Sequence, residues 1–271
     1  GLKLLREDLR KKGSDLIIRQ GDPVMEIPAL AAEVDADRVF AEEDFSPYAI
    51  RRDEKIKRLL PLQLVQGLVI HHPTMVVKPD QTPYTIFTPF SKTWHSLPQP
   101  SSPLSAPDYL NKLPPLYSVS LPETSPVDTF LAGEKEAIYI LHHFLENALL
   151  NYANNRDRLD LDGTSSLSPY LHFGMLSSRM AFKAAIDKMR ETKDFYQLKS
   201  INAWINELIW REFYQSVLYH FPNVLKESFK ERFRTFQWRE SQSDLHAWQE
   251  GRTGYPDVDA GMRPLSATGW M

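Results

Sequence analysis

A proline-rich segment divides this chain of 271 residues into two parts with different sequence patterns. Between Leu97 and Pro126 there are eight prolines and no glycine. Proline fixes φ and lacks a backbone N–H donor, so a regular helix or strand is not expected there. We interpret the segment as an extended connection, longer than most loops. The sequence therefore predicts one domain over residues 1–97, a linker over 98–130 and a second domain over 131–271.

The part before the linker alternates between predicted helices and predicted strands. Strands are predicted at residues 15–19, 37–41 and 67–72. A helix opens the chain, and another begins after Ser46, which is placed to cap it, with Pro47 at its first position. Pro28 is expected to interrupt any helix over residues 24–34. The alternation predicts an α/β domain, Rossmann-like, with a parallel sheet that lacks its first strand or strands.

The part after the linker has the periodicity of helices. Helices are predicted over residues 134–156, 177–191 and 200–221. The last of these, SINAWINELIWREFYQSVLYHF, places Trp204, Glu207, Arg211 and Tyr214 in one arc, at about 100° per residue. The opposite arc is apolar and contains Ile205, Ile209, Phe213 and Val217. This pattern predicts an all-α domain in which one face of the last helix does more than pack against a core.

Two interpretations of that face stay open from the residues alone. In the first, the helix is buried on two sides, and Glu207 and Arg211 form an i,i+4 salt bridge worth a few tenths of a kcal/mol if exposed. In the second, aromatic rings that include Trp204 and Trp210 stack on a planar ligand or base, and the charges read its polar edge. Spacing does not decide between a structural helix and a binding helix.

A run of small hydroxyl residues lies in the segment LDGTSSLSPYLHFG, residues 161–174. Such a run offers backbone N–H and hydroxyl donors at the start of a helix, which suits a phosphate group. The alternative is an ordinary loop in which Ser168 caps a helix and Pro169 occupies its first position. Local sequence alone favours the capped loop.

Composition limits the classes of function. With a net charge of −3, the chain is not expected to be a dedicated nucleic-acid binder, so a DNA-binding surface has to be a local patch. The absence of cysteine removes disulfides, thiolate metal sites and cysteine nucleophiles, and it fits a cytoplasmic location. No apolar run approaches the roughly 18 residues of a membrane helix. The DxD pattern at Asp257 and Asp259 is weak evidence for a metal, so no metal site is predicted.

Several long segments, taken in order, resemble one family, the DNA photolyases and cryptochromes. They are GTSSLSPYLHFG, WINELIWREFYQ and EGRTGYPDVDAGMRPLSATGWM, supported upstream by PYTIFTPFSKTW and SPYAIRRDEK. The resemblance extends over almost the whole chain and is closest to the cyclobutane pyrimidine dimer photolyases of class I type. It implies an α/β antenna domain, a linker and an all-helical domain that holds a folded FAD. It also implies an internal fragment that lacks both ends of the family's chain.

The resemblance further implies an activity. Such enzymes use blue light to excite reduced FAD, which donates an electron to a pyrimidine dimer flipped out of DNA; the dimer splits and the electron returns. Damaged DNA is thus the implied partner of a monomeric protein, and a second, antenna chromophore is left unidentified. The alternative is a cryptochrome, a blue-light photoreceptor without repair activity. Glu207 and Trp210 favour repair, because a sensor needs no lesion contacts.

Individual roles are also implied by the resemblance. The FAD-contacting positions are Tyr152, Thr164, Ser165, Ser166, Leu167, Ser168 and Trp204. Glu207 is implied to hydrogen-bond the dimer and stabilise its radical anion, and Trp210 to pack on the dimer. Contacts with DNA are implied for Arg156, Glu207, Trp210, Arg211 and Tyr214. Trp238 is implied as the outer tryptophan of the electron-transfer chain that photoreduces the flavin.

Two residues depart from the family's pattern. Ser166 stands where many relatives have a basic residue, so pyrophosphate binding is expected to lose one charge. Pro264 stands where an amide side chain is usual, and it is expected to interrupt a helix at a cost of about 3 kcal/mol.

Overall fold

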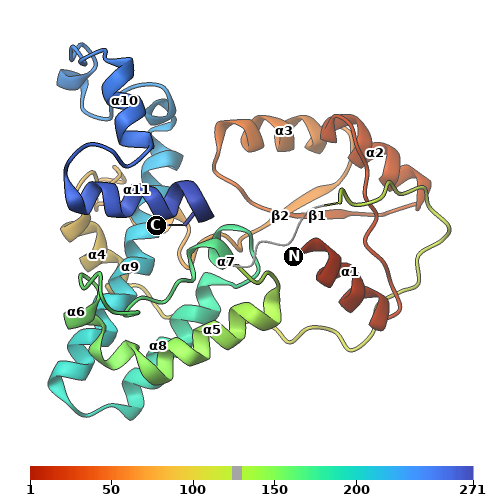
Figure 1. The fold of residues 1–271 in the computed structure, drawn as a ribbon. Coiled ribbons are helices and arrows are strands. Elements are labelled where there is room, and N and C mark those ends of the chain that lie inside the picture. Colours follow the sequence, from red (N-terminus) through yellow and green to blue (C-terminus); the bar gives the residue numbers. More distant parts are fainter. Residues whose placement is uncertain (124–129, 271) are drawn as a thin grey trace. The chain divides into compact units, whose positions relative to one another are not determined.

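The computed structural model describes residues 1–123 and 130–270; residues 124–129 and 271 lie outside the described part. The chain forms two compact units, one that joins its N-terminal part to Ala132–Leu225 and one built mainly from Lys226 onward. An α/β part and an all-helical part are both present, as expected (Figure 1). The predicted limits of the domains and linker stay a prediction, and residues 124–129 of that linker lie outside the described residues.

The α/β part is built on two parallel strands, β1 (Val39–Glu42) and β2 (Leu62–Val65), joined by helix α3 (Pro47–Lys57). Strand β1 confirms the strand predicted near residues 37–41. Ser46 caps α3 as predicted, because its side chain accepts a hydrogen bond from the backbone N of Ala49 at 3.3 Å. A helix that connects two parallel neighbours is the expected βαβ arrangement.

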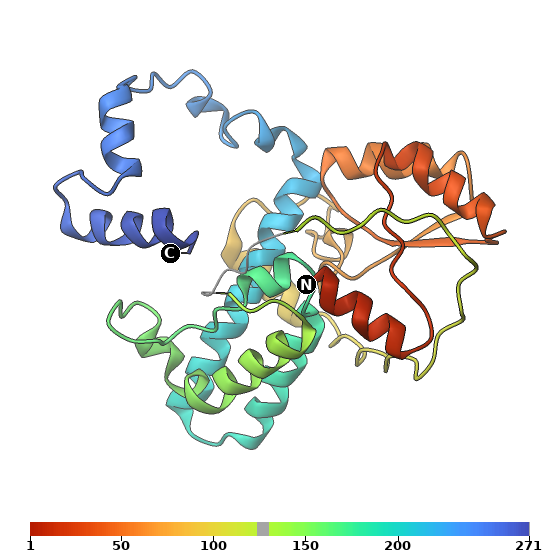
Figure 2. The same ribbon diagram turned by 45° about the vertical axis from the view of Figure 1, so that its right-hand side comes forward.

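Helices cover both sides of this strand pair. Helices α2 (Pro23–Glu33) and α3 lie on one side, and α1 (Leu2–Lys11) lies on the other (Figures 1 and 2). Helix α2 continues through Pro28, so the predicted interruption was wrong. An interior proline removes one backbone hydrogen bond, and Asp22 stabilises the start of α2 by accepting from Val24 N at 2.9 Å.

Two of the three predicted strands are not formed. Residues 15–19 belong to no strand and make only isolated backbone hydrogen bonds with the linker, such as the bond from Val119 N to the Ile18 carbonyl at 3.0 Å. Residues 67–72 form a loop, and the second strand lies just before them, at β2. The apolar run in this loop is buried against a helix rather than in a sheet, and periodicity does not distinguish these two kinds of burial.

The helical part is organised around α9 (Phe195–His220), which begins at the cap Asp194. The remaining helices of the first unit are α4 (Phe87–Ser96), α5 (Glu134–Asn147), α6 (Tyr152–Asn155), α7 (Ser168–His172), α8 (Ser178–Glu191) and the short turns Pro73–Met75, Leu149–Asn151 and Pro222–Leu225. Helices α4, α6 and α8 pack on α9. Its apolar arc is fully buried at Ile205 and Ile209, as predicted. The described residues 98–123 contain no helix or strand, as their prolines predict.

The second unit contains α10 (Gln242–Gln249), α11 (Pro256–Thr268) and the turn Glu231–Phe233. Asp259 holds the turn before α11, since its carboxylate accepts from Thr253 Oγ1 at 2.6 Å and from Gly254 N at 3.1 Å. These hydrogen bonds keep the pKa of Asp259 below its usual range. Helix α11 continues through Pro264, so the interruption predicted there was wrong. Within the described residues, no helix is both long and apolar enough to cross a membrane.

Candidate functional site

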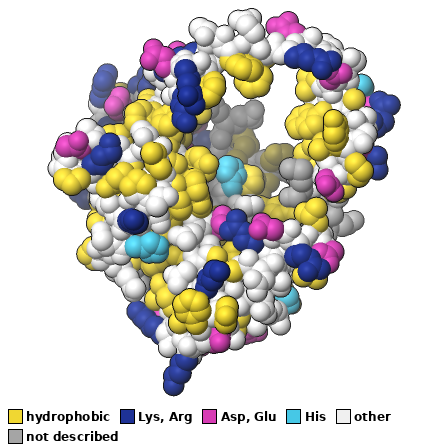
Figure 3. All heavy atoms as spheres, turned by 90° about the vertical axis from the view of Figure 1, so that its left-hand side faces the viewer, with side chains coloured by type: hydrophobic (Ala, Val, Ile, Leu, Met, Phe, Trp, Pro, Cys, Tyr) yellow, Lys and Arg dark blue, Asp and Glu magenta, His cyan; other side chains and the backbone are white. Residues whose placement is uncertain are grey.

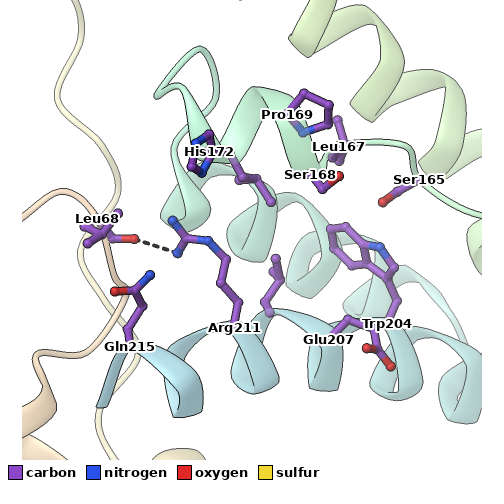
Figure 4. A pocket seen from close by; sticks show the side chains of 12 residues that line it. Leu68, Ser165, Leu167, Ser168, Pro169, His172, Trp204, Glu207, Arg211 and Gln215 are labelled. Atoms are coloured by element: carbon purple, nitrogen blue, oxygen red, sulfur yellow. Dashed lines mark hydrogen bonds between the residues drawn. The ribbon is translucent and has the colours of Figure 1, made fainter. Parts of the chain in front are cut away.

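A cavity of about 630 Å³ lies along one face of α9, within the first compact unit. Its lining includes Ser165, Leu167, Ser168, Trp204, Glu207 and Arg211. In Figure 4, Trp204 and Arg211 rise from α9 toward the segment that carries Ser165 and Ser168. The face of α9 that stood out in the sequence therefore borders a cavity, and the serine run forms part of the opposite wall.

The serine run turns sharply before it enters α7. Ser166 has a φ of 50°, in the left-handed region that only a few non-glycine residues adopt. Helix α7 begins at Ser168 and its cap position is Leu167, so the prediction of Ser168 as the cap was one residue late. Ser165, Leu167 and Ser168 line the cavity, whereas Thr164 and Ser166 belong to the same run without lining it. Two hydroxyl groups are thus available inside the cavity.

Three aromatic rings cluster next to the cavity at this end of α9. Trp204 is 3% exposed and packs against Phe144, with ring centroids 5.3 Å apart. Tyr152 is also buried and meets Phe144 edge-on at 6.0 Å. Trp204 lines the cavity, and Tyr152 belongs to the same aromatic cluster from outside the lining. The structure therefore brings Trp204, Tyr152 and the serine run to one region, and their contacts with FAD stay a prediction.

Glu207 and Arg156 form an ion pair next to this cluster. Arg156 Nη1 lies 2.5 Å from Glu207 Oε1, and both side chains are 38% exposed. The Arg156 guanidinium also lies over the Tyr152 ring, 5.7 Å from its centroid. The predicted i,i+4 salt bridge between Glu207 and Arg211 is not formed, so this part of the structural interpretation was wrong. A residue 51 positions earlier in the chain holds Glu207 instead.

Arg211 is directed to the loop before α4 rather than to a carboxylate. Its Nη1 donates to the Leu68 carbonyl at 2.7 Å (Figure 4). Burial lowers the pKa of this guanidinium, and the charges of Glu212 and Glu42 act in the opposite direction. Of the described residues, none places a carboxylate within ion-pairing distance of Arg211. Its positive charge is therefore available to an anionic ligand in the cavity that it lines.

Trp210 and Tyr214 form a separate aromatic cluster on α9. The Trp210 ring stacks on Phe87 of α4, with centroids 3.6 Å apart and planes 4° apart, and lies 5.7 Å from Tyr214. Neither Trp210 nor Tyr214 lines the cavity, and Tyr214 is 63% exposed. Trp210 follows Glu207 by three positions, which turns it about 60° away from Glu207 around the helix. The structure does not bring Trp210 into the cavity with Trp204.

Trp238 lies in the second compact unit. Its side chain is 77% exposed and meets Phe236 edge-on, with centroids 4.9 Å apart. On the face of the molecule in Figure 3, Lys and Arg side chains are interspersed with acidic and hydrophobic ones.

Sequence reasoning missed Glu212, the most deeply buried carboxylate of α9. It is 2% exposed and accepts hydrogen bonds from Trp94 Nε1 at 2.7 Å, from His71 N at 3.2 Å and from Ile70 N. Burial raises its pKa to about 7, although these hydrogen bonds and the nearby Arg211 favour the charged form. Its helical angle falls in the apolar arc, and a carboxylate there signals a buried polar contact.

Two family models match the chain. The model described as DNA photolyase matches residues 1–108, and the model described as the FAD binding domain of DNA photolyase matches residues 204–271. Relatives named deoxyribodipyrimidine photo-lyase align with the whole chain; those from Thermus thermophilus and Halobacterium salinarum are each 36% identical, over 276 and 288 residues. The chain belongs to the DNA photolyase family. It spans 61% and 59% of the length of these two relatives.

Solved structures of the photolyase family have the same fold. A class III photolyase from Agrobacterium tumefaciens matches 100% of this chain and 59% of its own, with a TM-score of 0.91 and 29% identity. A Synechocystis cryptochrome matches 99% of this chain and 59% of its own, with a TM-score of 0.88 and 26% identity. A photolyase from Sulfolobus tokodaii, described with two FAD molecules, matches with a TM-score of 0.73 and 25% identity over 100% of this chain and 58% of its own.

Proposed function

We propose that the full-length protein repairs cyclobutane pyrimidine dimers in DNA with blue light and bound FAD. The observation that carries this proposal is the cavity along α9, where Ser165 and Ser168 face Trp204 and where Glu207 stands at the lining. These residues come from segments about 40 positions apart in a chain that matches named photolyases from end to end. Their convergence supports one ligand site rather than two unrelated structural features.

The residues of the cavity fit the anionic and aromatic parts of FAD. Ser165 and Ser168 supply hydroxyl donors, and the left-handed backbone at Ser166 is a conformation found in anion-binding turns. Arg211 adds a half-buried cation without a carboxylate partner among the described residues. We assign Tyr152, Thr164, Ser165, Ser166, Leu167, Ser168 and Trp204 to the FAD site. When bound and reduced, FAD supplies the light-excited electron donor for dimer splitting.

Glu207 and its surroundings are assigned to the lesion. In this proposal the Glu207 carboxyl group hydrogen-bonds the flipped-out dimer, and by donating a proton into that hydrogen bond it stabilises the negative charge that develops on the dimer. Arg156 holds that carboxylate in place, and its remaining guanidinium donors are available for a DNA phosphate. Trp210, Arg211 and Tyr214 are assigned to DNA contacts, and Trp238 to delivery of electrons from the surface.

A flavin-retention experiment tests this site. We expect the full-length protein to purify with FAD, and the double variant Ser165→Val/Ser168→Val to retain several-fold less, because two donors to the phosphate region are lost. Ser177→Val is the matched control, since Ser177 is exposed, makes no side-chain capping bond and does not line the cavity. Retained FAD would be quantified by absorbance after gel filtration. A full-length protein that takes up no FAD on reconstitution would refute the assignment.

The second candidate is a cryptochrome-type photoreceptor without repair activity. It is favoured by one observation, the likeness to the Synechocystis cryptochrome over 99% of the chain. Blue-light repair of an oligonucleotide with one thymine dimer separates the two candidates: FAD binding with no repair above a dark control would favour the photoreceptor. A second chromophore, a monomeric state and a cytoplasmic location remain predictions; the two FAD molecules described for the Sulfolobus photolyase support the first of these.

A further inference from the structure

A second cavity lies along a different face of the first unit, between α8 and the start of the linker. Its volume is about 220 Å³, and it shares no lining residue with the cavity along α9. Three basic side chains line it from α8: Arg179, Lys183 and Arg190. Their spacing of four and seven positions places them along one face of the helix. The linker contributes Ser101 and Ser102 to the lining of the same cavity.

Arg179 is the residue that distinguishes this cavity from an ordinary basic surface. Its Nε atom is buried and has no hydrogen-bond partner. In the described part of the chain, no carboxylate is within ion-pairing distance of its guanidinium. A buried donor without a hydrogen-bond partner destabilises the folded protein by about 1–3 kcal/mol, and such donors are rare in native proteins. An acceptor that binds in the cavity would remove that cost.

The charges around the cavity leave a net positive site. Asp187 is the acid nearest in sequence, and it pairs with both Lys183 at 2.9 Å and Arg190 at 2.9 Å. One carboxylate therefore offsets two cations, while Arg179 is not offset. No acidic side chain is part of the cavity lining that the structure describes. Arg190 also donates to the Gln99 side chain at 3.2 Å, which ties the linker to this face of α8.

We propose that this cavity binds a small molecule that carries a phosphate group. A dianionic phosphate matches the excess of two positive charges, and its oxygens match the guanidinium, ammonium and hydroxyl donors. The cavity adjoins a smaller one of about 120 Å³, with which it shares Gln99, Phe182 and Ile186. That neighbour is lined by rings, including Trp94, and gives room for an apolar group next to the phosphate. The site is independent of the proposed repair function.

The probe for this site is inorganic phosphate, titrated into the full-length protein by calorimetry at constant ionic strength with chloride as the replaced anion. We expect saturable binding of one phosphate per chain. Arg179→Gln should weaken it about tenfold or more, the range of a hydrogen bond to a charged group. Lys183→Gln should weaken it as well, and this exposed residue carries the test if Arg179→Gln does not fold. Lys188→Gln is the control, since it removes the same charge from α8 outside the lining.

Each possible result of this titration either supports or overturns the proposed phosphate site. Saturable binding that Arg179→Gln and Lys183→Gln weaken and Lys188→Gln leaves unchanged supports the site. Equal weakening by all three variants would show nonspecific attraction to α8 and overturn the proposal. The absence of saturable phosphate binding also overturns the proposal. So does binding of undamaged duplex DNA that Arg179→Gln weakens, if added inorganic phosphate does not compete with that DNA.

Discussion

Helix α9 carries two glutamates, five positions apart, whose surroundings are opposite. Glu207 is 38% exposed and is held by Arg156 at the lining of the larger cavity. Glu212 is 2% exposed and is surrounded by three donors from the polypeptide itself. The five-residue separation turns the two side chains to different sides of the helix, by about 140°. One carboxylate can reach a ligand, and the other cannot.

The difference shows how one helix serves binding and folding together. Glu212 fixes the loop at residues 70–71, and its neighbour Arg211 fixes the same loop at Leu68. Arg211 also lines the cavity, so the loop, the buried carboxylate and the cavity wall form one connected structure. The free energy spent on burying Glu212 is recovered only through its hydrogen bonds. Glu207 needs no such compensation, because water reaches it.

The largest expected effect is on stability when Glu212 is removed. Glu212→Ala leaves Trp94 Nε1 and two backbone N–H groups without an acceptor in a buried region. We expect the free energy of unfolding to fall by roughly 3–5 kcal/mol, the range for breaking a buried polar network. Urea denaturation of the full-length protein measures it. A loss below about 1 kcal/mol would mean that water or a rearranged loop replaces the carboxylate, and the contrast with Glu207 would fail.

The next effect is a dependence of stability on pH that Glu212 produces. Its pKa is about 7 in the folded protein and 4.5 in the reference state, so between these values the folded state binds more protons. Its contribution is therefore complete below about pH 4.5 and declines as the pH rises to about 7, by at most about 3 kcal/mol. His71 opposes it, because burial and Arg179 lower the His71 pKa. Comparing the wild-type protein with Glu212→Gln separates the contribution of the Glu212 carboxylate from that of His71.

We expect the difference in unfolding free energy between the wild-type protein and Glu212→Gln to change between about pH 4.5 and pH 7 and to be constant above about pH 7. Urea melts at about pH 5, 6, 7 and 8 are sufficient. Parallel curves for the wild-type protein and Glu212→Gln would show that the carboxylate does not titrate in this range, and the buried network would then hold a permanent charge.

Part of this arrangement follows from the sequence and part does not. The cap at Ser46, strand β1 and the two arcs of α9 were predictable, because each depends on neighbours within a few residues. The loop at residues 67–72 was mistaken for a strand, because its partner Glu212 lies about 141 positions away. A local pattern of apolar residues cannot identify such a partner.

In the candidate site, too, some residues could be predicted from the sequence and others could not. The serine run and Trp204 could be proposed from motifs, and the structure places them around one cavity. The partner of Glu207 could not be proposed, since Arg156 and Arg211 are equally good cations in sequence. Trp210 was assigned with Glu207 because the motif contains both, although its ring stacks on Phe87 outside the cavity. Glu212 was detectable, since a charge in an apolar arc requires buried donors.

A smaller effect is expected on repair when Glu207 is changed. Glu207→Ala should lower the repair yield per absorbed photon by roughly tenfold or more, as expected for a lost charge-assisted hydrogen bond of about 1.5–3 kcal/mol. The FAD content should stay normal. Quantum yield on a thymine-dimer oligonucleotide measures the effect. Glu231→Ala is a control on an exposed glutamate of the second unit, and equal losses in both variants would remove Glu207 from the proposed lesion site.

The smallest expected effect is the stability change on removing Glu207, and it completes the contrast with Glu212. The pair with Arg156 is more than one-third exposed, so solvent screens it and its coupling should be at most about 1 kcal/mol. Glu207→Ala should therefore lower the unfolding free energy several-fold less than Glu212→Ala. A double-mutant cycle of Glu207→Ala and Arg156→Ala, measured by urea denaturation at low and high salt, gives the coupling directly. It should shrink as salt is added. A coupling of about 3 kcal/mol that does not fall with added salt would mean that Glu207 is a structural residue like Glu212, bound too tightly by Arg156 to contact a DNA lesion.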